Sequence, residues 1–280
     1  MLNSLDFNLN TKNYDKDSHT LTIKDKVNET YFLNFEDDSI NQLKIEVINS
    51  DITIIENYKG QVKKVDFTIN VDEKSKVNRC SIIVNTTSSQ KIIRNINNNG
   101  QYQSMQIDLT NKNVDSIENI NLNHADAYAV VIDGIYATNK SNKKYQTNLN
   151  HFIANCTSKA QIFAINNDNA HVSIFTDAYI KNGAVGTKTN QEGRIINLSE
   201  NCNGIVLPNL HIDENDVEAS HSCSVGSVNQ DHMYYLESRG LSNSQAKNIL
   251  IRGYFNPILE NITNETVKEE IINVLEQRIG

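Results

Sequence analysis

The chain has 280 residues, and its 26 Lys and Arg against 34 Asp and Glu give a formal net charge of −8. Hydrophobic residues make up 38% and charged residues 21%, which is enough to build a core and excludes a wholly disordered chain. The negative balance disfavours a nucleic-acid-binding face or a basic membrane anchor, since phosphate partners need clustered positive charge.

The lack of targeting and zinc-site motifs predicts a cytoplasmic protein whose thiols are reduced. No run approaches the roughly 18 apolar residues of a transmembrane helix. The first ten residues, MLNSLDFNLN, have no basic region followed by an apolar block, so no secretory signal is expected. The four cysteines lie far apart, without the C-x-x-C pairs of structural zinc sites. Free thiols are expected.

Asparagine is unusually frequent, with 43 residues against 2 Pro, 11 Gly and no Trp. The first explanation is codon bias in an AT-rich genome. The second is structural, because Asn tolerates left-handed backbone conformations and caps turns with its side chain. A fold of many short strands and tight turns would accept it well.

Residues 6 to 216 predict short strands separated by turns. Each run is mostly apolar at alternate positions and is bounded by Asn, Asp, Gly, Ser or Lys. The clearest runs are 43–58, 62–71, 79–87, 102–110, 127–137, 160–167, 171–180 and 193–200. No helical period interrupts them, which argues against a Rossmann fold. Evenly spaced strands with Asn-rich corners favour a parallel β-helix over a sandwich, although no strict repeat is visible.

The last quarter of the chain predicts helices. Residues 229–240 form a short helix with Asn229 as N-cap and Gly240 at its C-terminal end. Ser242 and Gln245 have the form of a capping box that opens a second helix, which Pro257 is expected to limit. A third helix begins near residue 264 and carries apolar residues at helical spacing.

Residues 208–255 carry a motif of several separated elements in order. They are Pro208-x-Leu210-x-Ile212, Asp216-Val217, Ser220-His221, Val225-Gly226, Tyr234-Tyr235-Leu236-x-Ser238-Arg239-Gly240-Leu241, and the segment from Ala246 to Phe255. This pattern resembles the SufB/SufD family of iron–sulfur cluster assembly scaffolds. Weaker matches lie at residues 151–158 and 194–199.

The resemblance implies a mostly β fold, a right-handed parallel β-helix followed by a small C-terminal α-helical domain. The expected division is residues 1–225 for the β-helix and 226–280 for the helical domain. The helical region that usually precedes the β-helix in the family is expected to be missing here.

The resemblance also implies a role. Family members pair through their β-helices, dock the ATPase SufC through the helical domain, and assemble a nascent cluster at the subunit interface. The chain has no G-x-x-x-x-G-K-[ST] loop, so it cannot supply the ATPase site. A non-catalytic scaffold subunit is predicted, with a SufC-type ATPase and either a SufB-like subunit or a second copy of itself as partners.

His221 is the first candidate for contact with the cluster, because the resemblance places this histidine at the subunit interface and imidazole suits iron. Cys223 lies two residues further, on the same face of a continuing strand, and could join His221 as a ligand. A small buried hydrophobic residue is nevertheless the preferred interpretation of Cys223. Glu218 could supply a hard carboxylate ligand, as could Asp216, but solvated strand residues are equally expected. His151 and His171 rank lower.

Cys202 is a further candidate for the cluster site, although packing is the preferred interpretation, as it is for Cys156 and Cys80. Counting back from Pro208 places the sulfur-accepting cysteine of SufB-like members at Gly193. Its absence favours a SufD-like identity.

The surface that docks the ATPase is expected within residues 229–255. The candidate residues are Tyr234, Tyr235, Arg239, Gly240 and Leu241. Tyr235 and Leu236 are expected to pack the core of the helical domain, and Arg239 to cap a helix or meet the ATPase.

Three alternatives stay open. The chain could be a SufB-like sulfur acceptor, a parallel β-helix carbohydrate-active enzyme, or a β-helical binding module. No acid cluster of the kind that such enzymes need stands out. A transient iron–sulfur cluster is the expected cargo, whereas a flavin has no Gly-rich fingerprint to support it.

Overall fold

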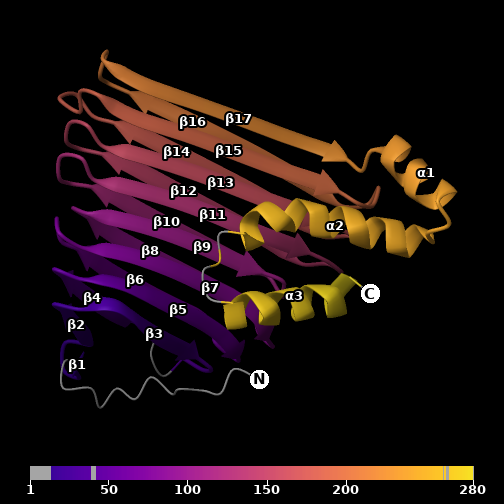
Figure 1. Cartoon of the computed structure of the whole chain (residues 1–280), viewed down its shortest axis with the longest axis horizontal. Helices are drawn as coiled ribbons and strands as arrows, with labels where there is room; N and C mark the ends of the chain where they lie inside the picture. Colours follow the sequence, from indigo (N-terminus) through magenta and orange to yellow (C-terminus); the bar gives the residue numbers. More distant parts are fainter. Residues whose placement is uncertain (1–13, 39–41, 261, 263–264, 280) are drawn as a thin grey trace.

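The strands of the chain stack as successive coils of a parallel β-helix. The computed structural model describes residues 14–38, 42–260, 262 and 265–279. Each coil contributes one strand to each of two sheets, and every pairing from β2 onward is parallel. Figure 1 shows the coils rising from the N-terminal strands to α1. The predicted β-helix with C-terminal helices is confirmed.

Sheet A contains the even-numbered strands and β1. In spatial order they are β1 (Tyr14–Asp15), β2 (Thr20–Lys24), β4 (Gln42–Ile48), β6 (Lys64–Val71), β8 (Gln90–Asn98), β10 (Val114–Leu122), β12 (Asn142–His151), β14 (His171–Ile180) and β16 (Asn203–Ile212). Sheet B contains β17 (Val217–Ser227), β15 (Thr187–Asn197), β13 (Thr157–Asn166), β11 (Tyr128–Ala137), β9 (Gln101–Asp108), β7 (Lys76–Thr86), β5 (Asp51–Gly60) and β3 (Val27–Phe35).

The alternation seen in the sequence divides each strand between the lumen and the outer surface. In β10, every second residue from Val114 to Leu122 is buried. Because coils stack in register, each lumen position lies directly over its counterpart in the coil below, and Ile92, Ile96 and Ile120 join one continuous apolar core. The stacked apolar side chains hold the coils together.

Asparagine has both a corner role and a ladder role. Asn49, Asn139 and Asn155 adopt left-handed conformations at corners, with φ of 46°, 61° and 61°. On the outer face of sheet A, Asn side chains of successive coils hydrogen-bond to one another. One ladder joins Asn70, Asn97, Asn121 and Asn150, and a second joins Asn95, Asn119 and Asn148. The corner role was predicted, whereas the ladders were not.

A buried ionic cluster occupies the lumen of the middle coils. Glu56 accepts from Arg79 at 3.1 Å and from Arg94 at 2.8 Å, and Arg79 also contacts Glu118 at 2.9 Å. Burial by itself raises the pKa of Glu56, but Arg94 and Arg79 outweigh it and hold the pKa below its ordinary value. These charges come from β5, β7, β8 and β10, so only stacking brings them together.

A second buried pair lies close by, where the Nζ of Lys143 is 2.6 Å from Oδ1 of Asp108. The lumen thus holds three cations, Arg79, Arg94 and Lys143, against Glu56, Glu118 and Asp108. Asp133 adds a fourth carboxyl group, and burial, reinforced by Glu118, raises the pKa of Asp133 to about 7. A protonated Asp133 leaves the six charges balanced.

Three helices follow the last coil: α1 (Gln230–Ser238), α2 (Asn243–Leu259) and α3 (Glu265–Ile279). Asn229 caps α1 as predicted, and Gly240 follows its end at a φ of 91°. The capping box of Ser242 and Gln245 is present at the start of α2. None of the described helices is long and apolar enough to cross a membrane.

The expectation that Pro257 limits the second helix is wrong, because α2 continues to Leu259. The residues beyond the proline, Ile258 and Leu259, are both buried in the apolar cluster that α2 shares with sheet B. This packing favours a helical conformation although proline cannot donate a backbone hydrogen bond.

α2 and α3 lie across the outer face of sheet B (Figure 1). Phe255 and Ile258 of α2 and Ile271 of α3 form one apolar cluster with Ile107 and Tyr136 of the sheet. Gly134 makes this approach possible, since a Cβ there would lie 2.7 Å from Cδ1 of Ile258. The helices therefore share a core with the outer face of the β-helix.

Asp133→Asn should flatten the dependence of stability on pH. The pKa of Asp133 is about 7 in the folded chain, above its ordinary 3.8. The folded chain therefore keeps a proton that the unfolded chain releases. The stabilisation is complete below about pH 4 and is lost as the pH rises through 7, by at most about 1.4 kcal/mol per pH unit. Urea unfolding from pH 4 to pH 8 measures how the free energy of unfolding changes with pH. The same change with pH in the variant and the wild type would contradict the raised pKa of Asp133.

Candidate functional site

The last coil leaves one end of the β-helix uncovered. β16 and β17 form the edges of their sheets, and no described strand pairs with their outer sides. Lumen-facing residues at the end of β16 and from His221 onward in β17 are consequently exposed, in contrast with those of earlier coils, although Val206 stays buried. Val225 is 46% exposed and Ile212 is 41% exposed, while Ile195 beneath Val225 is fully buried. This open end presents apolar groups and unpaired backbone groups together.

His221 and Cys223 both lie at the open end and face the lumen side. The register of β17 on β15 pairs His221 with Gln191 and Cys223 with Gly193. Since Gln191 is fully buried inside the β-helix, its partner His221 points to the same side. Both side chains are exposed, and Cys223 is the one exposed free thiol among the four cysteines. The structure thus places these two candidates side by side, and the preferred interpretation of Cys223 as a small buried residue is wrong.

Glu218 lies on the opposite face of β17. It stands next to Lys188 of β15, and the Nζ of Lys188 is 2.8 Å from its carboxylate. The side chain is 75% exposed and points away from the lumen that His221 faces. The structure therefore does not bring Glu218 together with His221 and Cys223. Asp216 precedes β17, and its carbonyl accepts from the amide of Gly186.

The other three cysteines pack into the protein. Cys202 is buried at the start of β16, and its thiol donates to the carbonyl groups of Ser199 and Asn166. Cys156 is buried in the lumen core, where burial raises its pKa. For Cys80 on the outer face of sheet B, burial raises the pKa to about 12. Because burial favours the protonated form, the thiols of Cys156 and Cys80 are poor nucleophiles and poor metal ligands.

Gly193 sits where the lumen narrows beneath Cys223. A Cβ added at Gly193 would lie 2.4 Å from Cγ1 of Val206, and a Cβ at Gly204 would lie 2.7 Å from Cγ2 of Ile195. The two sheets approach closely here because both positions lack side chains. The space that a cysteine at position 193 would need is filled by Val206.

His151 is part of a buried hydrogen-bonded layer rather than the open end. Its Nε2 is 2.9 Å from the hydroxyl of Ser158, which in turn lies 2.7 Å from that of Thr189. Burial lowers the pKa of His151 to about 4, so the ring is neutral. His171 hydrogen-bonds Ser173 on the outer face of sheet A. Neither histidine adjoins His221 in the sheet register.

No resident metal site is visible in the part of the chain that the structure describes. No three His, Cys, Asp or Glu side chains gather there in a group that could hold an ion. His221 and Cys223 provide two donors from one chain. A metal at the open end would therefore need further donors from a partner or from its own cargo ligands.

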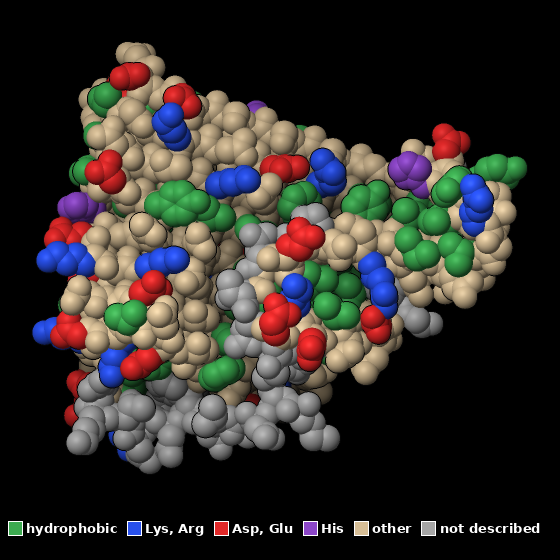
Figure 2. All heavy atoms as spheres, in the orientation of Figure 1, with side chains coloured by type: hydrophobic (Ala, Val, Ile, Leu, Met, Phe, Trp, Pro, Cys, Tyr) green, Lys and Arg blue, Asp and Glu red, His purple; other side chains and the backbone are tan. Residues whose placement is uncertain are grey.

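Tyr234 and Tyr235 sit on α1, which projects beyond the last coil, and the candidates Arg239, Gly240 and Leu241 follow its C-terminal end. The expectation that Tyr235 packs the helical core is wrong, since Tyr235 is 57% exposed and Tyr234 is 74% exposed. The apolar contact of α1 runs instead through Met233, with Leu236 half-buried. Arg239 lies over the Tyr235 ring at 5.3 Å. Figure 2 shows hydrophobic side chains beside charged side chains and a histidine at this tip.

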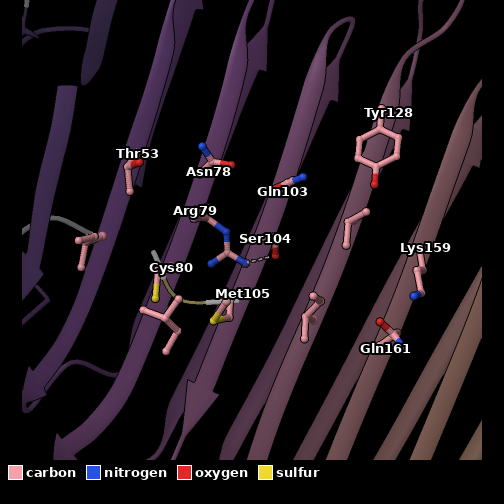
Figure 3. Close-up of a pocket in the computed structure, with 14 residues that line it drawn as sticks. Thr53, Asn78, Arg79, Cys80, Gln103, Ser104, Met105, Tyr128, Lys159 and Gln161 are labelled. Atoms are coloured by element: carbon pink, nitrogen blue, oxygen red, sulfur yellow. Dashed lines mark hydrogen bonds between the residues drawn. The ribbon is translucent and has the colours of Figure 1, made fainter. Parts of the chain in front are cut away.

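A cavity of about 440 Å³ on the outer face of sheet B was not predicted (Figure 3). The residues that line it include Asn78, Gln103, Tyr128, Lys159, Cys80 and Met105. In-register pairing sets Cys80 beside Met105. Arg79 turns away from the cavity toward Ser104 and the lumen cluster. The mixed lining shows no convergent catalytic group, and no sequence signal marked it.

Comparison with known proteins adds an independent line of evidence. Residues 39–254 match a family described as SUF system FeS cluster assembly, SufBD core domain. The chain is 38% identical over 100 residues to the iron-sulfur cluster assembly protein SufD of Bacillus subtilis, a match covering 36% of this chain and 23% of that protein.

Two further relatives agree. An iron-sulfur cluster assembly SufBD family protein of Mycobacterium leprae is 32% identical over 111 residues, covering 39% of this chain and 28% of that protein. SufD of Escherichia coli is 29% identical over 72 residues, covering 26% of this chain and 17% of that protein. The matched segments thus span less than a third of each of these relatives.

Gly193→Ala should destabilise the chain by about 1–3 kcal/mol, because the new Cβ collides with Val206. Val206→Ala in the same chain should relieve most of this cost, since it removes the colliding methyl groups. Urea unfolding of both single variants and the double variant gives the coupling energy. If the double variant loses as much unfolding free energy as the two single variants together, the side chains at positions 193 and 206 do not collide.

Proposed function

Because the chain belongs to the SufBD core domain family, we propose that it is a SufD-like scaffold subunit on which iron–sulfur clusters are assembled. The observation that carries the proposal is the open end of the β-helix, where His221 and Cys223 face outward from an uncovered lumen. A scaffold of this kind binds cargo between subunits and leaves ATP hydrolysis to a partner.

The open end is suited to pairing with another β-helix. Exposed backbone edges of β16 and β17 can add strands from a partner. The exposed lumen-side residues Ile212 and Val225 would be covered in the same contact. A SufB-like subunit or a second copy of this chain would complete the coil.

His221 and Cys223 would supply donors to the iron of the nascent cluster, which is the cargo of the machine. Imidazole is a borderline ligand and thiolate a soft one, and both suit iron–sulfur chemistry. Partner residues would complete the coordination. Val206 fills the space below Cys223 where a SufB-like acceptor cysteine is expected, which favours the SufD-like role.

A SufB-like sulfur acceptor remains the second candidate. The specific observation in its favour is that Cys223 is an exposed free thiol on the lumen side of the open end. If Cys223 accepts sulfur, it forms a persulfide when the chain is incubated anaerobically with a cysteine desulfurase and cysteine. Mass spectrometry of the wild type and Cys223→Ser distinguishes this role from that of a ligand.

α1 would dock a SufC-type ATPase. It is the helix that stands away from sheet B, and its exposed Tyr234, Tyr235 and Arg239 match the aromatic and arginine anchors of protein interfaces. The buried faces of α2 and α3 are occupied by sheet B. Removing the helices would expose the apolar outer face of sheet B. Point variants therefore test docking better than truncation.

Tyr235→Asp should abolish co-elution with a SufC-type ATPase, because it places a charge in the proposed contact. The loss should reach at least about tenfold in affinity, as for other aromatic anchors. Val27→Asp is the matched control, since Val27 is an exposed apolar residue on the third strand, far from α1. Unchanged co-elution of Tyr235→Asp would place docking elsewhere.

His221→Ala should reduce cluster accumulation on the anaerobically co-expressed complex by at least about tenfold while the complex still forms. The amount of cluster is measured by its absorbance and by the iron content per complex. His171→Ala is the control, because His171 lies on the outer face of sheet A. Full cluster content in His221→Ala would overturn its assignment as a ligand.

A further inference from the structure

Gln191 lies directly beneath His221 and is the buried polar group nearest the proposed cluster site in the sheet register. It belongs to β15 and is fully buried. Its Nε2 donates to the backbone carbonyl of Asn209 on β16 at 3.3 Å, so the amide reaches across the lumen toward the last coil. Its Oε1 has no hydrogen-bond partner. A buried amide oxygen without a donor is costly and rare.

On the covering strand β17, one lumen-facing side chain carries an N–H that can donate to this oxygen. Along the lumen side of β17 stand Val217, Ala219, His221, Cys223 and Val225. Among these side chains only the imidazole carries an N–H, and in-register neighbours on parallel strands lie about 5 Å apart on the same face. The next polar groups along the layer, Thr189 and Ser158, are already bonded to each other.

We propose that Gln191 is a positioning residue for His221. Its amide oxygen accepts the N–H of one imidazole nitrogen, which fixes the ring and its tautomer. The other nitrogen then presents its lone pair outward, toward the iron of the cluster cargo. This arrangement rests on the proposed scaffold function, and it is the same device by which outer groups orient metal-binding histidines.

The hydrogen bond to Asn209 explains why a glutamine suits position 191. The bond from Nε2 to Asn209 sets which end of the amide faces His221, so the acceptor oxygen is fixed rather than free to exchange with the NH₂ group. Thr176 and Thr187 also have unpartnered hydroxyl groups in this region. Their register neighbours are Pro208 and Val217, neither of which has a side-chain donor.

The test is the tautomer of His221 in the 280-residue chain, labelled with ¹⁵N at histidine and observed at about pH 8, above the ordinary imidazole pKa of ~6.5. Two-bond ¹H–¹⁵N spectra should show one tautomer for His221 in the wild type and in Gln191→Glu, which keeps an acceptor. Gln191→Met, which keeps the volume but loses the acceptor, should show a mixture. Gln161→Leu, on the outer face of sheet B, should match the wild type.

His151 provides a reference in each spectrum, because its ring is bonded to Ser158 and to the carbonyl of Tyr179 and should not respond. Iron affinity should fall roughly tenfold in Gln191→Met and recover in Gln191→Glu. A tautomer mixture for His221 in the wild type would overturn the proposal even if Gln191→Met does not fold. So would a single tautomer in Gln191→Met. Cluster retention by His221→Ala would instead overturn the ligand role and leave the tautomer result standing.

Discussion

In-register stacking of parallel coils is the constraint on which the rest of the structure depends. Each lumen side chain is covered by the corresponding side chain of the next coil, so burial is a property of the stack and not of any one strand. The final coil has no coil above it. The same residue pattern that builds a core elsewhere therefore produces an exposed apolar end in β16 and β17. The proposed site is a consequence of where stacking stops.

The lumen is not uniformly apolar, and its polar layers follow the same stacking rule. Four coils bring Glu56, Arg79, Arg94 and Glu118 together, and the buried charges compensate one another. Such a cluster favours one register, because slipping a strand by one residue would move a charge out of the network. A second polar row, hydrogen-bonded from His151 through Ser158 to Thr189, lies below the open end, and Gln191 follows two residues after Thr189 on the same face of β15. Rigid rows of this kind are suited to holding His221 in one orientation.

The C-terminal helices divide into two parts with different surroundings. α2 and α3 cover the apolar outer face of sheet B, so they are part of the core of the β-helical domain. α1 contacts little of the sheet and exposes its two tyrosines at the end of the molecule. A partner held by α1 would lie close to the open end, because β17 leads into α1 after only two residues. Cluster assembly and ATPase docking would then occupy adjacent surfaces.

The sequence by itself determined the features that depend on local order. Alternation over two residues predicted the strands, and side-chain capping predicted Asn229 and Ser242 at helix starts. The motif from Pro208 to Phe255 predicted the family and singled out His221. Each of these signals is carried by residues close together in the chain.

Tertiary structure alone decided what depends on residues far apart. Glu56 and Arg94 are 38 positions apart and meet only after stacking, so no spacing marked them. Glu218 and His221 look adjacent in sequence, yet odd spacing on a strand sends them to opposite faces. Packing against sheet B extended α2 past Pro257, and the lack of a covering coil left Cys223 exposed. Pattern predicts an element, whereas its neighbours decide which of its side chains are buried, paired or left free to bind.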